Sequence, residues 1–538
     1  MSRELFGRAA LDLIPKILTL QDRNAHSPTY GCFDRNFWHY KIIDFPSGMA
    51  AEFVWPLALA YTLPIKNNPY FGQGAIKEWV TAGIRYAARS AHTDGSCDDY
   101  FPFEKAAGAA AFSLLAGLES YTLLALHDET ILEYFARRTD WLADHHESGR
   151  LTNHQALIVL CLELAGRIFE SDRWEKLKLK RLKRVLEWQN AEGWFQEYEG
   201  ADPGYHTLTC GLLAQYLALR SESKANTGQH DQLGGALGKA ITFATHFIHP
   251  DGSFGGEYTS RNTYNYFPHG FEIAAQWFPE ASALNDRFAA GLSRELGPCY
   301  ADDHILGHHA WSYLLAWQHW RDQRASAPVA TNGRTHFKQA GLLVDRRGDA
   351  TLYLALNKGG ACKFFRGDRL IHSDTGFSVV TGGKKRRTAV SHLVGKYKVD
   401  LCDPAITISG RLGWAKTKQM TTFNLVVLRA LMFTVGRFFP NLIRKLLQKM
   451  LITGKKPARY EFTRELTWQP GGELEMRDTL CAPTWTDVEE VAIGTSQTSI
   501  YVVMSRTYQP GQLEPWHDLT PELERLPEDE PLVVERKF

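Results

Sequence analysis

The sequence has 538 residues, of which 44% are hydrophobic and 22% are charged, and its formal net charge is +1. This composition is that of an ordinary soluble globular protein, and the length predicts two or three domains. Eight scattered cysteines without a Cys-x-x-Cys pair argue against a disulfide framework or a zinc finger. Arg3, Glu4 and Arg8 interrupt the apolar N-terminus, and the most apolar run, 425–435, is too short to span a membrane. We therefore expect neither a signal peptide nor a transmembrane segment, and we expect the protein to be cytoplasmic.

The first part of the chain, from about Phe37 to Trp320, carries apolar residues at helical spacing. The expected helices span 49–63, 75–90, 104–126, 130–145, 153–169, 174–189, 207–219, 233–248, 271–278 and 308–320. Glycine turns recur every 45 to 60 residues or so, which suits repeated helix pairs. Some helices, such as 156–164, are apolar almost all round, whereas 174–189 has a Lys/Arg face. Alternating inner and outer helices predict an (α/α) toroid over residues 1–325.

A linker rich in small residues spans 324–333. After it, the spacing of the apolar residues changes from helical to alternating. Short β-branched or alternating runs then predict an antiparallel β-sandwich over 334–538. The expected strands are 340–345, 351–356, 361–365, 377–381, 405–409, 460–466, 473–479, 488–493 and 499–504. The acidic, Pro-containing end, 514–535, is expected to form an extended strap or a loose tail. The fold class is thus α+β and multidomain: a toroid, then a β-sandwich with a helical insertion at about 420–453.

The insertion is amphipathic over 422–451. One face is an apolar stripe made of Leu442, Ile443, Leu446, Leu447, Met450 and Leu451. The opposite face is made of Arg444, Lys445, Gln448 and Lys449. Such a helix can lie on a membrane or pack against a partner. We favour a third interpretation, in which the stripe docks onto the protein's own toroid or sheet.

Two polar pairs stand at the starts of successive inner helices. Asn153-His154 opens one of them, and Tyr205-His206 opens the next. A helix N-terminus offers free N–H groups and a positive end that suit a carboxylate, although Asn is also a common N-cap. Because consecutive inner helices of a toroid are neighbours, we expect these four residues to converge.

The order of an Asn-His pair, then Gly-Trp-Phe-x-Glu (193–197) and Gly-Tyr-His (204–206), then a linker and a β domain, resembles the heparinase II/III-like and alginate-lyase-like polysaccharide lyases. The resemblance implies β-elimination on an acidic, uronate-containing polysaccharide. It implies that Asn153 helps neutralise the uronate carboxylate, that His154 is a base or second neutraliser, and that Tyr205 exchanges the proton at the glycosidic oxygen. It also implies a periplasmic or secreted location, in contrast to the missing signal.

A second cluster of aromatic and polar residues follows the turn at 251–254. Arg261 and Asn262 are candidate carboxylate binders there, since Arg binds carboxylates bidentately, or else Arg261 pairs structurally with Glu257 or Glu272. The further residues expected to bind substrate are Trp194, His206, Glu257, Tyr258 and His269.

The β domain departs from the family pattern, because it lacks the expected His-x-His-x-Asp motif near 359–364. Asp374, His392 and His372 make at most an incomplete zinc site. We therefore expect no required cofactor, with a structural zinc ion as the minor alternative.

Two other functions remain open. A glycoside hydrolase on the same toroid needs only two carboxylates, and the candidates are Asp98, Asp99, Glu104, Glu197, Glu199, Glu257 and Glu272. A non-catalytic lyase-like protein that binds an anionic polysaccharide during its assembly would explain the lost motif. The basic run 384–387 is too short and isolated to indicate a nucleic-acid partner. Nothing in the sequence decides the oligomeric state.

Overall fold

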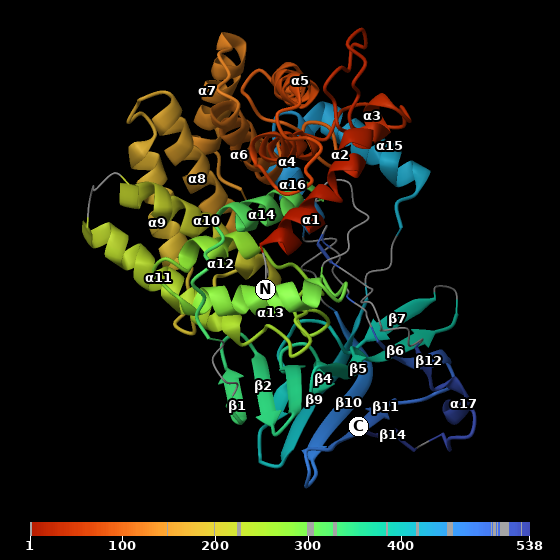
Figure 1. Ribbon diagram of the computed structural model, residues 1–538. Helices are drawn as coiled ribbons and strands as arrows, with labels where there is room; N and C mark the ends of the chain where they lie inside the picture. Colours follow the sequence, from red (N-terminus) through yellow and green to blue (C-terminus); the bar gives the residue numbers. More distant parts are fainter. Residues whose placement is uncertain are drawn as a thin grey trace.

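A computed structural model of the chain describes residues 3–147, 149–197, 200–222, 227–297, 306–326, 331–383, 386–415, 419–448, 456–495, 498, 502, 504–505, 516–528 and 530–538. Helices occupy the first three-fifths of the chain and strands most of the rest, and the two regions lie against each other (Figure 1). The strand expected at 499–504 falls mostly outside the described residues.

The helical region consists of short and medium-length helices. These are α1 (Glu4–Leu11), α2 (Ile14–Leu20), α3 (Arg35–Trp38), η1 (Met49–Phe53), α4 (Val54–Thr62), α5 (Gly74–Ser90), α6 (Ala107–Leu123), α7 (Glu129–Asp144), α8 (Thr152–Ile168), α9 (Glu175–Glu187), α10 (Pro203–Glu222), α11 (Thr227–Thr245), α12 (Pro268–Ala274), α13 (Glu280–Leu292) and α14 (Leu306–Gln318).

Six of these helices pack against one another in a closed circuit: α4 on α6, α6 on α8, α8 on α10, α10 on α12, α12 on α14, and α14 on α4. Each of the remaining long helices packs against a member of this circuit: α5 against α4, α7 against α6 and α8, α9 against α8, α11 against α10, and α13 against α12. The sequence explains the two classes. Helix α6 is rich in Ala and buried along most of its length, whereas α9 buries one stripe and exposes lysines.

The strands form two antiparallel sheets. Their bounds are β1 (Gly333–Phe337), β2 (Leu342–Arg347), β3 (Ala350–Ala355), β4 (Ala361–Arg366), β5 (Arg369–Asp374), β6 (Gly376–Thr381), β7 (Arg387–Val390), β8 (Lys398–Asp400), β9 (Ala405–Trp414), β10 (Pro457–Trp468), β11 (Leu474–Cys481), β12 (Val488–Gly494), β13 (His517–Asp518) and β14 (Leu532–Lys537). The first five make a meander, and the others pair in the order β13-β12-β6-β7-β9-β10-β11-β14, with β8 on β9.

The five-stranded sheet is covered on both faces. Val344, Tyr353 and Phe365 belong to the core of the helical region. Leu352 and Phe364 pack instead with residues of β9, β10 and β11, among them Leu466. This double burial explains why β3 is buried throughout, whereas β10 alternates between buried and less buried residues.

The chain end is more ordered than expected. A loose tail was one of the two expectations for 514–535, but β14 pairs antiparallel with β11, with Leu480 opposite Leu532. A short helix, α17 (Thr520–Leu523), precedes it. The Pro-rich acidic segment therefore leads into an edge strand.

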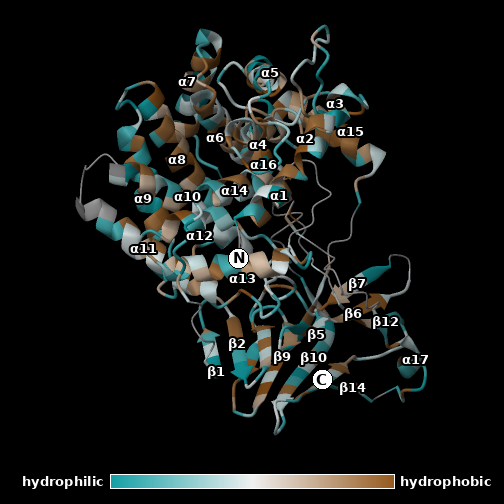
Figure 2. Ribbon diagram, viewed as in Figure 1, coloured by the Kyte–Doolittle hydropathy of each residue, from teal (hydrophilic) through white to brown (hydrophobic). Residues whose placement is uncertain are grey.

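The insertion between β9 and β10 returns to the helical region. It contains α15 (Thr422–Leu431), the π-helical turn η2 (Met432–Gly436) and α16 (Pro440–Gln448), and it lies at the end of the helical region remote from the sheets (Figure 1). Figure 2 shows hydrophobic residues along α15 at the edge of the molecule. Among the described helices, none has the length and apolar character needed to cross a bilayer.

The docking expected of the apolar stripe is wrong for its described part, whereas Met450 and Leu451 lie outside the described residues. Ile443 is buried, but Leu442 and Leu446 are 60% and 49% exposed, while Arg444 from the polar side is only 8% exposed. The reason is electrostatic, since Arg444 contacts the carboxylates of Glu104 and Glu147 on the helical region.

Candidate functional site

The first turns of α8 and α10 carry the two polar pairs. Asn153 is the second residue of α8 and Tyr205 the third of α10, and these helices pack against each other. Asp202 caps α10, because its Oδ1 accepts a hydrogen bond from the Tyr205 amide at 3.1 Å. Pro203 at the first helical position reinforces this start. The sequence thus fixes both residues at positive helix ends.

Glu197 lies between the two helix starts. Its carboxylate accepts hydrogen bonds from the Asn153 backbone amide at 3.3 Å and from Asn153 Nδ2 at 2.9 Å. Glu197 is 1% exposed, and burial raises its pKa to about 7, although Arg261 and Asn153 act in the opposite direction. The carboxyl group is therefore poised to exchange a proton near neutral pH.

Arg261 joins this carboxylate to Tyr205. The Arg261 Nε atom is 3.3 Å from Asp202 Oδ2, and its Nη2 atom is 3.9 Å from Glu197 Oε2. Its guanidinium carbon lies 4.6 Å from the centre of the Tyr205 ring. The partners of Arg261 are therefore Asp202 and Glu197, and not the Glu257 or Glu272 that the sequence offered. Asn262, also buried, follows with a left-handed backbone, φ 55°.

His154 forms a second ion pair beside the first group. Its Nδ1 atom is 2.7 Å from Glu147 Oε2, and its side chain is 21% exposed. Burial alone would lower the pKa of His154, but Glu147 and Glu197 outweigh it and the net shift is upward. Burial would likewise raise the pKa of Glu147, yet His154 and Arg444 hold it at about 2. The pair therefore favours an imidazolium beside a carboxylate.

The other residues expected to bind substrate are buried in internal contacts. His206 Nε2 is 2.8 Å from the Ala240 carbonyl oxygen, and Tyr258 OH is 3.0 Å from His249 Nε2. Glu257 pairs with Lys363 at 2.9 Å. His269 Nδ1 contacts Ser312 and Trp194 Nε1 donates to Glu192, while both side chains are at most 5% exposed. The geometry therefore brings together Asn153, His154, Tyr205 and Arg261, and leaves these five apart.

The three candidate metal ligands do not fit a zinc ion. Asp374 is bound by the guanidinium groups of Arg464 and Arg536 and by His372 Nε2 at 2.9 Å. Two adjacent cations oppose a divalent metal. His392 is buried near Lys358, and burial lowers its pKa to about 3. Within the described ranges, no group of three or more His, Cys, Asp or Glu side chains is arranged to hold a metal.

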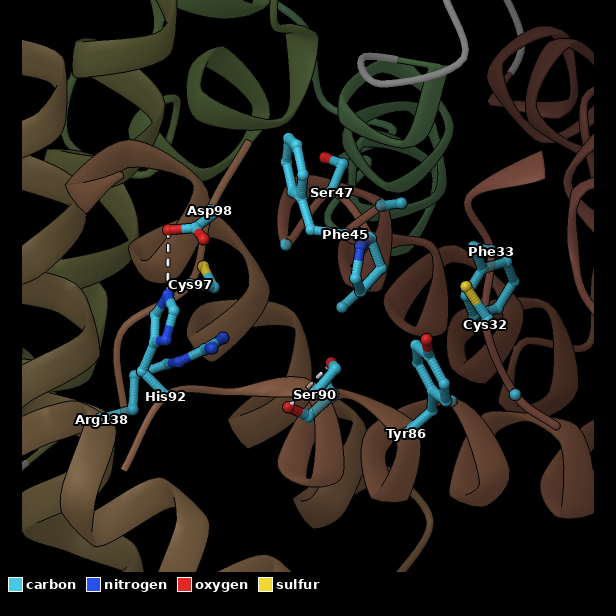
Figure 3. A pocket seen from close by; sticks show the side chains of 17 residues that line it. Cys32, Phe33, Phe45, Ser47, Tyr86, Ser90, His92, Cys97, Asp98 and Arg138 are labelled. Atoms are coloured by element: carbon cyan, nitrogen blue, oxygen red, sulfur yellow. Dashed lines mark hydrogen bonds and ion pairs between the residues drawn. The ribbon is translucent and has the colours of Figure 1, made fainter. Parts of the chain in front are cut away.

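A cavity of about 100 Å³ lies beside α5 (Figure 3). His92 and Asp98 contact each other on its wall at 3.0 Å between Nε2 and Oδ1. Its volume is below the roughly 300–1,000 Å³ of typical ligand pockets. Asn153, Tyr205 and Arg261 do not line it, so it is separate from the candidate site.

Comparison with known proteins finds likeness at the level of the fold. No family model and no curated protein sequence matches the chain. The solved structures that are similar to it include three polysaccharide lyases. A xanthan lyase of Paenibacillus has a TM-score of 0.52 at 10% identity, over 98% of this chain and 56% of the other. The chondroitin AC lyase of Streptomyces coelicolor A3, determined with chondroitin sulphate, has a TM-score of 0.52 at 11% identity, over 99% and 78%. A heparinase III has a TM-score of 0.48 at 13% identity, over 83% and 63%.

The chain thus spans less than two thirds of the heparinase III and xanthan lyase chains. At 10–11% identity, the likeness to the xanthan lyase and the chondroitin AC lyase is one of fold.

Sequence reasoning missed several residues of the site. Glu197 was a candidate only for hydrolysis, and Glu147, Asp202 and Arg444 were not singled out. Asp202 carried a usable signal, since Asp before Pro is a helix start. Arg444 carried no such signal, because its contacts with Glu104 and Glu147 depend on how the insertion packs against the helical region.

Proposed function

We propose that the helical region is an (α/α) toroid, that the two sheets form a β-sandwich, and that the protein is a polysaccharide lyase acting on an acidic, uronate-containing polysaccharide. The closed circuit of α4, α6, α8, α10, α12 and α14 supports the toroid. The shared fold with two lyases of TM-score 0.52 supports the class of enzyme.

One observation carries the proposal: Asn153, Glu197, Arg261 and Tyr205 form a continuous chain of contacts across two helix N-termini. A β-eliminating enzyme must stabilise negative charge on a carboxylate while it moves a proton nearby. Amide, guanidinium and helix-end donors supply the first requirement here, and a phenol supplies the second. Within the described residues, Asn153 Oδ1 has no hydrogen-bond partner, although Asn153 is 1% exposed.

In the proposed reaction, Asn153 and Arg261 hold the uronate carboxylate and His154, as imidazolium, adds positive charge. Tyr205 acts as the phenolate beside the Arg261 guanidinium and takes the proton from the carbon next to the carboxylate. The electron pair of that C–H bond forms the new carbon–carbon double bond as the bond to the glycosidic oxygen breaks. The Tyr205 proton then passes to the leaving oxygen. The raised pKa of His154 favours neutralisation over a role as base.

The test is the ultraviolet absorbance of an unsaturated uronyl product, measured together with reducing ends on a panel of acidic polysaccharides. We expect Tyr205→Phe to lose about 10² to 10⁴ in rate, the usual contribution of general acid–base catalysis. Tyr216→Phe is the matched control. Tyr216 lies on the same helix, and its hydroxyl has no hydrogen-bond partner among the described residues. Equal rates for both variants would remove Tyr205 from the mechanism.

A second candidate, hydrolysis, rests on two carboxyl groups of opposite character. The pKa of Glu197 is raised to about 7 and that of Glu147 is lowered to about 2. One carboxyl group with a raised pKa and one with a lowered pKa are typical of the general acid and the carboxylate base of glycosidases. New reducing ends without absorbance would favour this function. Binding without either signal would favour a non-catalytic polysaccharide-binding protein.

A further inference from the structure

The insertion between β9 and β10 exposes an unusual amount of apolar surface. None of the side chains of α15 is buried, although its sequence is mostly apolar. Phe423 is 75% exposed, Phe438 72% and Phe439 61%. Burying large apolar side chains is the main favourable term in folding, so a surface of this kind marks an interaction site.

The patch is continuous with two loops of the helical region. Phe433 of η2 packs edge-on against Phe103, with ring centres 5.2 Å apart, and Arg429 pairs with Asp44 at 3.1 Å. Near these anchors, Ile42 is 71% exposed and Tyr100 61%. Most of the large exposed apolar side chains of the described residues thus gather at this end of the molecule.

The charges that the insertion itself carries are of one sign, although Arg429 is paired with Asp44, and Arg444 with Glu104 and Glu147. Between Ala415 and Tyr460 the sequence has ten Lys and Arg and no Asp or Glu. Arg437 and Lys445 are exposed on the insertion itself. A second copy of the chain would bring the same cations across a twofold interface, where they would repel. A binding partner that complements this surface is therefore anionic and can bury the phenylalanine side chains.

We propose that the insertion docks the protein onto an anionic lipid surface, with Phe423, Phe438 and Phe439 in the acyl boundary and Arg437 and Lys445 among the headgroups. An interfacial helix combines an apolar face with basic residues in this way. Each cation near an anionic membrane adds affinity that falls with salt. The inference does not depend on the proposed lyase activity.

The experiment is co-sedimentation of the full chain with phosphatidylcholine vesicles, with and without phosphatidylglycerol. We expect binding to the anionic vesicles that weakens as salt is added, and little binding to phosphatidylcholine alone. The double variant Phe438→Ser/Phe439→Ser should bind at least about tenfold more weakly, because apolar area leaves the interface. Arg437→Gln/Lys445→Gln should weaken binding and flatten the salt dependence.

Val533→Ser is the control, because Val533 is 39% exposed on β14, in the sheet region. It should bind like the unmodified protein. All of these positions are exposed, so the folded state is checked simply by circular dichroism. Absence of binding to anionic vesicles, or equal binding to both kinds, would overturn the proposal. Self-association in sedimentation equilibrium that the double Phe variant abolishes, without vesicle binding, would assign the surface to a second copy.

Discussion

Arg444 of α16 lies 2.7 Å from a carboxylate oxygen of Glu147, a residue 297 positions earlier in the chain. The other oxygen of Glu147 contacts His154. Arg444 therefore links the insertion, through Glu147, to His154 of the candidate site. Arg444 also lies 3.3 Å from Glu104. Because Arg444 is nearly buried, this network holds the insertion more firmly than a surface ion pair would.

Replacing Arg444 with Met should loosen the insertion. The change leaves two largely buried carboxylates without their guanidinium partner, which typically costs about 3 kcal/mol. Hydrogen exchange of the α16 amides measures the loss directly. Lys445→Met is the control, since the neighbouring exposed side chain should change stability by no more than about 0.5 kcal/mol. Equal protection in both variants would show that Arg444 does not anchor α16.

Glu147→Gln should make the stability of the protein less dependent on pH. The folded pKa of His154 is raised, so its pairing stabilises fully below the unfolded value of about 6.5 and is lost as pH rises through the folded value. The pKa of Glu147 is lowered to about 2, so its contribution is present above its unfolded value and lost as pH falls toward 2.

The destabilisation caused by Glu147→Gln should therefore be greatest between about pH 4.5 and 6.5, the interval between the two unfolded pKa values. Urea unfolding across the pH range measures it. Glu187→Gln, which removes an exposed partner of Lys183, should give a small and constant difference. A flat profile for Glu147→Gln would contradict the ion pair.

Local sequence signals predicted the elements that carry the site. Helical spacing predicted 153–169 for α8, which spans Thr152–Ile168. The packing of α8 against α10 explains why Asn153 and Tyr205 are linked through Glu197 and Arg261. The start of α10 was expected at 207, whereas it lies at Pro203. There the Asp-Pro pair extends the helix by one turn beyond its apolar run.

Long-range contacts limited the rest of the prediction. Helices α1 and α2 were not expected, because they are short, and their buried residues gain their packing from α14. The polar edge strand β1 lacks a clear alternation, and it is defined by its pairing with β2. The burial of Arg444 in place of the leucine stripe depends on two acids far away in sequence, which no periodicity reveals.

Glu197→Gln should stabilise the protein increasingly as the pH rises. A carboxyl group whose folded pKa is raised contributes stability below its unfolded value, and that stability is lost as pH rises through the folded value, here about 7. A change from the ordinary value of about 4.5 to this one corresponds to about 3 kcal/mol. Glutamine cannot ionise and still accepts a hydrogen bond from Asn153.

The unfolding free energy of Glu197→Gln minus that of the unmodified protein should thus rise by about 3 kcal/mol between pH 4.5 and 8, as measured in urea. Glu104, whose pKa is also about 7, is present in both proteins and cancels. A difference that stays constant with pH would mean that Glu197 is ionised across the whole range.

Gly108→Ala should disturb His154 through packing alone. A Cβ atom at Gly108 would lie 2.7 Å from His154 Cε1 and 2.9 Å from Nε2, so the imidazole ring would have to move away from Glu147 or tilt. A misplacement of about 1 Å can cost about a hundredfold in rate, so the proposed role of His154 predicts a loss of activity of that order. Overpacking should also cost about 1 to 3 kcal/mol in stability. The imidazole NMR signals of His154 report the shift independently of activity.

Gly234→Ala on α11 is the control for Gly108→Ala. The new Cβ atom would meet open space, and the substitution should stabilise the helix by about 0.5 to 1 kcal/mol. An unchanged His154 signal with full activity in Gly108→Ala would show that the site tolerates movement of α6 and does not depend on this contact.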